Sequence, residues 1–137
     1  MFALVSLLLY GVWGFSYKLL SAREIHGEWV VSLVMLLGAI ISATIAVARS
    51  YPFPLEKVAG NIPWLLLVAA SGALGNIVLL KAMSSPGIST GVALAVSGAY
   101  PLVAAVLAYY FLGEQIGGVQ AVGILAVVLG VGLLTYK

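Results

Sequence analysis

The stretch Trp29–Ala48, WVVSLVMLLGAIISATIAVA, decides the fold because it runs for 20 residues without one charged side chain. An α-helix rises about 1.5 Å per residue, so this stretch matches a bilayer core roughly 30 Å thick. Four further charge-free runs lie around it, at Met1–Tyr17, Val58–Leu80, Ala82–Gly113 and Gln115–Tyr136. The sequence therefore predicts an all-α integral membrane protein with five transmembrane helices.

Composition and connection lengths leave no room for a soluble domain. Hydrophobic residues make up 64% of the chain and charged residues 7%, far outside the mixture of a water-soluble protein. The connections Ser21–Glu28 and Ser50–Asn61 are only linker-sized. We therefore predict one transmembrane domain over residues 1–137. The first run lacks the features of a cleaved signal peptide and is expected to stay as a span.

Residues for enzymatic chemistry are missing. The chain has no cysteine, which excludes disulfides and thiolate chemistry, and its single histidine, His26, lies in a connection. The four acidic residues, Glu24, Glu28, Glu56 and Glu114, all lie at span ends, so no carboxylate pair is embedded for acid and base catalysis. We predict no catalytic residue, no metal and no cofactor. The net charge of +2 is spread thinly, so no nucleic-acid partner is expected.

Two boundary residues have expected structural roles. Asn61 is expected to cap the third span, with Pro63 in its first turn. Glu114 lies between the fourth and fifth spans, where it can accept hydrogen bonds from the free donors that open the fifth helix.

Small residues recur at helical spacing within the spans. Lipid gives helices little hydrophobic drive to associate, so close backbone approach at small residues holds them together. The predicted packing positions are Gly72, Gly91, Gly123 and Gly130. In the third and fourth spans, the hydrogen-bonding groups of Asn76, Thr90, Ser97 and Tyr100 leave a polar path as the alternative to packing.

Pro101 and two lysines mark positions inside or at the ends of spans. Pro101 removes one helical hydrogen bond and predicts a bend near the middle of the fourth span, either to shape packing or to expose backbone to a cavity. Lys18 and Lys81 lie near helix ends. Each either extends its ammonium to the membrane surface or faces an aqueous cavity and attracts an anionic or carboxylate-bearing substrate.

These features together predict a substrate path. Tyr10, Gly14 and Tyr17 share one helix face, and so do Ser97 and Pro101. The predicted path consists of Trp13, Gly14, Tyr17, Lys18, Asn76, Lys81, Ser97, Tyr100 and Pro101. The alternative is a membrane scaffold without a cavity, in which Tyr17, Asn76, Ser97 and Tyr100 lie in helix contacts.

Several motifs occur in a recognisable order: Ala82-Met83, Pro101, Gly113-Glu114, Gly123 and Gly130. They lie within Lys81–Leu134, KAMSSPGISTGVALAVSGAYPLVAAVLAYYFLGEQIGGVQAVGILAVVLGVGLL, which resembles the second part of an EamA domain. This domain is the repeat unit of the drug/metabolite transporter superfamily. The Trp13-Gly14 pair is similar to the family's opening motif, so the resemblance covers essentially the whole chain.

The resemblance implies a transporter repeat whose first four helices surround a path while the fifth packs outside. Two departures limit it. The second span lacks the early arginine of many relatives, which removes an anion-binding role there. The first span lacks the embedded glutamate of the related small multidrug resistance proteins, which disfavours their proton-coupled export. The expected function is a transporter subunit for a small organic metabolite; the alternative is a non-transporting subunit that completes or regulates a partner transporter.

Assembly follows from the odd number of spans. Two tandem five-span repeats have opposite orientations, whereas this sequence has one repeat, so we expect an antiparallel homodimer or a sister subunit in the inner (plasma) membrane. Arg49 and Lys57 fall on one side, against Arg23 and Lys137 on the other. The charge bias stays weak even when Lys18 and Lys81 are added, which makes dual insertion plausible.

Overall fold

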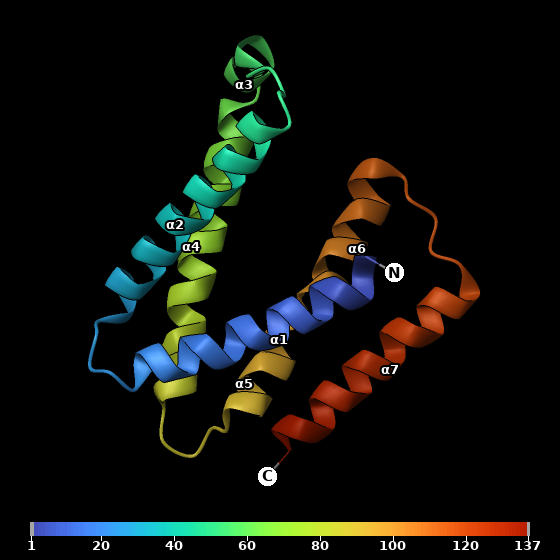
Figure 1. Ribbon diagram of the computed structural model, residues 1–137. Helices are drawn as coiled ribbons and strands as arrows, with labels where there is room; N and C mark the ends of the chain where they lie inside the picture. The colour runs from blue at the N-terminus through green and yellow to red at the C-terminus, as the bar shows by residue number, and fades with distance from the viewer. Residues whose placement is uncertain (1, 137) are drawn as a thin grey trace. The chain divides into compact units, whose positions relative to one another are not determined.

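The computed structural model describes residues 2–136, so Met1 of the first run and Lys137 of the charge count lie outside the described residues. Within that range the secondary structure is helical: α1 (Phe2–Ser21), α2 (Gly27–Ala48), α3 (Leu55–Gly60), α4 (Ile62–Ser84), α5 (Thr90–Ser97), α6 (Tyr100–Leu112) and α7 (Gly118–Thr135) (Figure 1). Five stretches are long and apolar enough to cross a membrane, one of them formed by α5 and α6 together. The predicted all-α fold with five spans is confirmed.

The chain forms two compact units. The first unit ends at Ser84 and contains α1 to α4, and the second unit begins at Ser85 and contains α5 to α7. In the first unit α4 packs against both α1 and α2, and in the second α5 packs against α7. Each unit is described by itself below.

The connection between α2 and α4 holds an element that the sequence did not predict, the short helix α3. Ser50 has a positive φ of 54°, and Pro52 and Pro54 keep the chain out of helix until Leu55. Asn61 then serves both helices that meet there. Its carbonyl accepts from the Leu65 N–H at 3.0 Å, as expected of a residue that opens α4, but its side-chain amide donates back to the Lys57 carbonyl of α3 at 2.9 Å.

The fourth span is broken in two, as the sequence predicted from Pro101. Helix α5 ends at Ser97 and α6 begins at Tyr100, which places Pro101 in the first turn of α6, where its missing N–H costs least. The break itself lies at Gly98 and Ala99, whose N–H groups bond back to Leu94 and Val96. The bend therefore starts just before the proline.

The junction between α6 and α7 differs from the expectation for Glu114. Gly113 ends α6 in the left-handed conformation, with φ 68°, and the Glu114 N–H donates to the Ala108 carbonyl at 3.3 Å. At the start of α7, the side chain of Gln120 accepts from the Gly117 N–H at 2.9 Å. Among residues 2–136 the Glu114 carboxylate accepts no hydrogen bond, because Gln120 on α7 itself takes the capping position.

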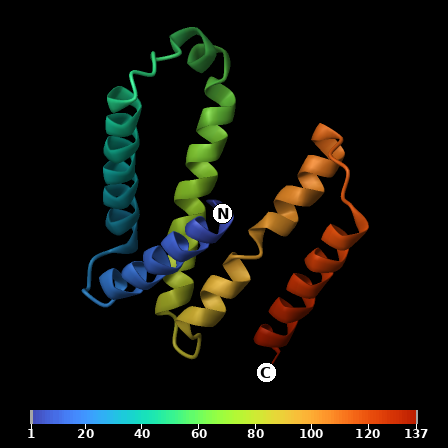
Figure 2. The same ribbon diagram turned by 45° about the vertical axis from the view of Figure 1, so that its right-hand side comes forward.

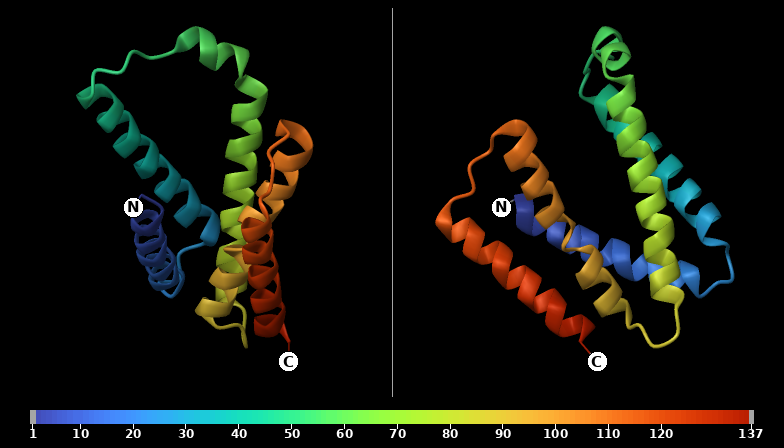
Figure 3. Two further views of the ribbon diagram at one scale, coloured as in Figure 1. Left: turned by 90° about the vertical axis from the view of Figure 1, so that its right-hand side faces the viewer. Right: turned by 180° about the vertical axis from the view of Figure 1, so that it is seen from behind.

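The buried side chains of the first unit gather at one end, where α1 ends, α2 begins and α4 ends. They are Tyr17, Val30, Val31, Leu80 and Met83. We call this region the three-helix end. Away from it α2 and α4 part from each other, which is clearest in Figure 2 and in the left view of Figure 3. In the second unit Ala93 of α5 is the buried residue.

Candidate functional site

Lys18 links two helices at the three-helix end. It lies in the last turn of α1, and its ammonium donates to the backbone carbonyl of Met83 in the last turn of α4 at 2.5 Å. The carbonyls that end a helix have no partner within it and carry partial negative charge, so a cation there is stabilising. The sequence left two roles open for Lys18, a surface anchor and a cavity lining. The structure favours a third role that the sequence did not indicate, a cap on the end of a neighbouring helix.

Lys81 forms the second polar link at this end. Its ammonium lies 3.5 Å from a carboxylate oxygen of Glu28, in the first turn of α2. Both charges suit their helix ends, because an acid favours the start of a helix and a base its end. The pair is open to solvent, with side-chain exposures of 70% and 56%, so it contributes less than a buried pair would.

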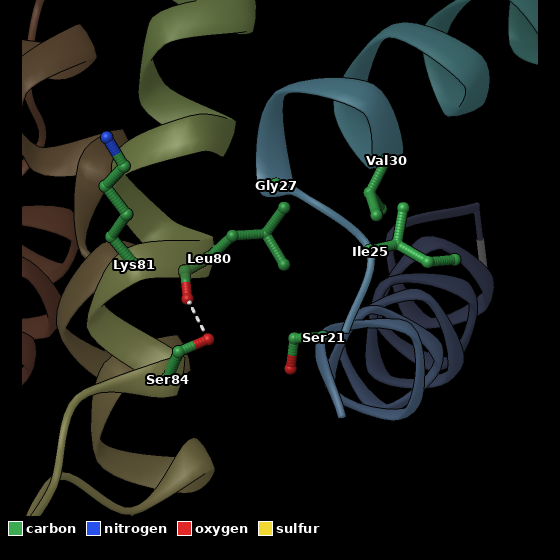
Figure 4. A pocket seen from close by; sticks show the side chains of 7 residues that line it. All are labelled: Ser21, Ile25, Gly27, Val30, Leu80, Lys81 and Ser84. Carbon is green, nitrogen blue, oxygen red and sulfur yellow. Dashed lines mark hydrogen bonds between the residues drawn. The ribbon is translucent and has the colours of Figure 1, made fainter. Parts of the chain in front are cut away.

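A small cavity lies between these helices. Its volume is about 100 Å³, and it is lined by Ser21, Ile25, Gly27, Val30, Leu80, Lys81 and Ser84. Figure 4 shows Leu80 extending from α4 towards Gly27 and Val30, while the Ser84 hydroxyl donates to the Leu80 carbonyl at 2.9 Å. Pockets for small organic ligands are typically about 300 to 1,000 Å³, so this cavity has room for waters rather than for a metabolite.

Three aromatic rings form a ladder along α1. The rings of Tyr10 and Trp13 meet edge to face with centroids 6.3 Å apart, and those of Trp13 and Tyr17 lie 4.3 Å apart at a tilt of 39°. Tyr17 is only 2% exposed, and Gly14 on the same face is buried. The ladder thus leads along the predicted path from mid-span to Lys18.

Most hydroxyl groups of serine and threonine in the spans are satisfied locally. Donation to a carbonyl three or four residues earlier in the same helix is found for Ser16, Ser32, Ser42, Thr44, Ser71, Ser97 and Thr135. Such groups are stable in lipid without any partner from another helix. They do not by themselves indicate a polar path, and this includes Ser97, which the sequence placed on it.

Other polar side chains in the spans retain hydrogen-bonding capacity, among them Asn76, Tyr10, Tyr17 and Tyr100. Asn76 donates one N–H to the Gly72 carbonyl at 2.9 Å, which leaves its amide oxygen and second N–H. Among residues 2–136 the hydroxyls of Tyr10, Tyr17 and Tyr100 make no hydrogen bond. Polar groups left over in a hydrocarbon layer cost several kcal/mol each, so they need water, a ligand or another protein surface.

The predicted path residues are divided between the two units. Trp13, Gly14, Tyr17, Lys18, Asn76 and Lys81 belong to the first unit. Ser97, Tyr100 and Pro101 belong to the second unit, where Tyr100 is 65% exposed. A single cavity containing all of them stays a prediction.

The packing glycines have different surroundings. A Cβ added at Gly72 would lie 3.6 Å from the Met35 methyl group, so this glycine lies against α2. Added Cβ atoms at Gly91, Gly123 and Gly130 would meet open space, so their packing role stays a prediction. On α7 the partly covered residues Ala121, Ile124 and Val131 lie on a different side of the helix from Gly123 and Gly130.

The spans define the chain as a multi-pass α-helical membrane protein. Its residues 1–136 match the family model of the EamA-like transporter family. The chain therefore belongs to this family, and it is a transporter-like membrane protein. Comparisons with curated proteins and with solved structures gave no match.

Sequence reasoning missed the partners at the three-helix end. It noted Glu28 only as a span-end acid and gave Ser21 and Ser84 no role, although all three lie beside the lysines or the cavity. The placement of charge could have indicated the contact of Glu28 with Lys81. An acid at the start of one span and a base at the end of another are complementary if those two ends meet.

Proposed function

We propose that this protein moves a small organic solute across the inner (plasma) membrane along a path bordered by the aromatic ladder of α1 and the amide of Asn76. The observation that carries the proposal is the contrast between the span hydroxyls, which bond to their own helices, and Asn76, Tyr10, Tyr17 and Tyr100, which keep unused polar atoms. A path for a partly polar solute supplies partners for those atoms and aromatic faces for its apolar part.

The test is flux through purified protein in liposomes. A panel of small neutral, anionic and cationic organic solutes should include at least one that crosses faster than through empty vesicles. Asn76→Leu should reduce that flux, because it removes polar atoms at nearly constant volume. Ser42→Ala is the matched control, since the Ser42 hydroxyl already donates to the Gly38 carbonyl at 2.9 Å and should not contact a solute.

We propose further that the path is completed by a second five-helix repeat of opposite orientation. That repeat is a second copy of this chain, forming an antiparallel homodimer, or a sister subunit. The support is the odd number of spans, the weak charge bias, and the exposed Gly123 and Gly130 face of α7.

A reporter fused after residue 137, active on only one side of the membrane, should give signal from both orientations if the partner is a second copy. Adding three lysines to the Ser50–Asn61 connection should collapse the signal to one orientation and lower flux. Co-expression with an oppositely biased variant should restore it. Signal from one side only, with full flux by the purified chain, would contradict the antiparallel dimer. Flux only with a partner protein present would favour the non-transporting subunit.

A further inference from the structure

We propose that the three-helix end is the fixed pivot of the first unit, and that α2 and α4 change their separation at the opposite end, where α3 joins them. The inference goes beyond solute transport, because it states which end of the unit stays closed. It rests on the distribution of burial, polar links and helix spacing within this unit.

The buried side chains of the first unit are concentrated at the proposed pivot. The buried side chains Tyr17, Val30, Val31, Leu80 and Met83 come from three helices and lie together where those helices meet. By contrast, every residue of α2 from Met35 to Ile45 and every residue of α4 from Ile62 to Ser71 is exposed. Packed side chains resist separation and exposed faces do not, so the free energy that holds α2 to α4 is concentrated at one end.

The polar links follow the same distribution. Lys18 ties α1 to the last turn of α4, and the pair of Lys81 with Glu28 ties α4 to the first turn of α2. Towards the other end the hydroxyls of Ser42, Thr44 and Ser71 bond within their own helices and hold nothing together. Any motion that keeps both links must therefore turn α2 about its beginning.

The spacing of α2 and α4 widens away from the pivot. A Cβ added at Gly27 would lie 3.7 Å from the Leu80 Cβ, so the two backbones are close there. Two turns further along α2, Met35 reaches Gly72 only with the methyl group at the end of its long, flexible side chain. The left view of Figure 3 shows α2 and α4 diverging with distance from the three-helix end.

The first experiment locks each end in turn. The natural chain has no cysteine, so introduced pairs react alone. The Gly27→Cys/Leu80→Cys pair suits a disulfide, because Cβ atoms about 3.8 Å apart are typical of disulfides. Oxidising it should leave flux within about twofold of the reduced protein, because a pivot does not open. Bridging Ile45→Cys/Leu65→Cys with a short thiol reagent should lower flux by about tenfold or more. Single-cysteine variants given the same treatment are the controls.

Reversible loss of flux on oxidising the Gly27→Cys/Leu80→Cys pair would overturn the proposal, because that end would then have to open. If the variant does not fold, Ser21→Cys/Ser84→Cys across the same cavity replaces it, bridged by a short reagent and judged by the same outcomes. The transport arm of this test rests on the proposed function.

A second measurement does not depend on transport. Bifunctional thiol reagents of increasing length are applied to both pairs in protein reconstituted in bilayers. When a mild oxidant is added instead of a reagent, the Gly27→Cys/Leu80→Cys pair should form a direct disulfide in nearly every molecule. The Ile45→Cys/Leu65→Cys pair should be bridged by reagents of several lengths, because its separation varies. Bridging by a single length would refute the moving end even if no solute is transported, and several lengths without flux would contradict only the proposed function.

Discussion

Replacing Lys18 by methionine distinguishes two roles of a lysine near the end of a span, a surface anchor and a cap on a neighbouring helix. If Lys18 only extends its ammonium to the membrane surface, Lys18→Met removes a cost of insertion and should leave the folded protein unchanged or more stable. If it caps α4, as its 2.5 Å hydrogen bond to the Met83 carbonyl indicates, the substitution should destabilise the fold. Methionine keeps the length and most of the apolar stem, so the change removes the charge and the donor.

The expected size follows from the contact. A hydrogen bond from a charged donor contributes about 1.5 to 3 kcal/mol, and the loss here leaves the carbonyl of a buried residue without that donor. We therefore expect Lys18→Met to lower the free energy of unfolding by about 2 kcal/mol. Lys81→Met is the matched control. It removes the same type of charge from the same end, but its ion pair with Glu28 is exposed, so its effect should be clearly smaller and should fade as salt is added.

The assay is reversible unfolding in mixed micelles, followed by the fluorescence of tryptophan. Of the three tryptophans, Trp13 lies one turn before Tyr17 and stacks on it, so its share of the emission reports on this region. Equal losses for the two variants, or a gain in stability for Lys18→Met, would refute the cap and return Lys18 to a surface anchor.

Three further substitutions test the helix junctions by the same unfolding assay. Gly98→Ala should lower the free energy of unfolding by about 1 to 3 kcal/mol, because its Cβ would lie 2.8 Å from the Leu94 carbonyl oxygen. The control Gly91→Ala adds a Cβ in open space and should be neutral, so equal effects would contradict the close approach at Gly98. Gly113→Ala should lower the free energy of unfolding by about 1 kcal/mol because φ is 68° there. The control Gly118→Ala has no positive φ and should leave stability unchanged, so equal effects would argue against the left-handed end of α6. Ser89→Ala should cost about 1 kcal/mol by removing the oxygen that caps the Val92 N–H, and Ser89→Asp should preserve most of the stability; equal losses would show that this cap contributes little.

The spans were predictable because they depend on local hydropathy. A bilayer demands a charge-free run of sufficient length, and Trp29–Ala48 or Gln115–Tyr136 meets that demand whatever its neighbours do. The break in the fourth span was predictable for a similar reason, since Pro101 cannot donate wherever the helix lies. Its exact place was not, because the turn at Gly98 and Ala99 depends on which earlier carbonyls accept their N–H groups.

The contacts of the lysines were not predictable from pattern alone. Lys18 and Met83 are 65 residues apart in the sequence, and they meet only because α1 and α4 end at the same place. Hydropathy placed Lys18 and Lys81 at span ends but could not say that α2 would begin beside them with Glu28. For Asn76 and the tyrosines, the sequence identified the groups, and the structure added which of their polar atoms are still unused.

The location of the polar links also follows from the membrane environment. In lipid the spans gain little by burying apolar faces against each other, so specific contacts must supply much of the stability of the unit. Charged side chains such as Lys18 and Glu28 can supply such contacts at low cost only near helix ends, where they stay within reach of water at the membrane surface. A unit held in this way is firm at one end and weakly held along the rest of its spans. The arrangement that lets Lys18, Lys81 and Glu28 stabilise the first unit thus also leaves α2 and α4 free to move apart at the other end.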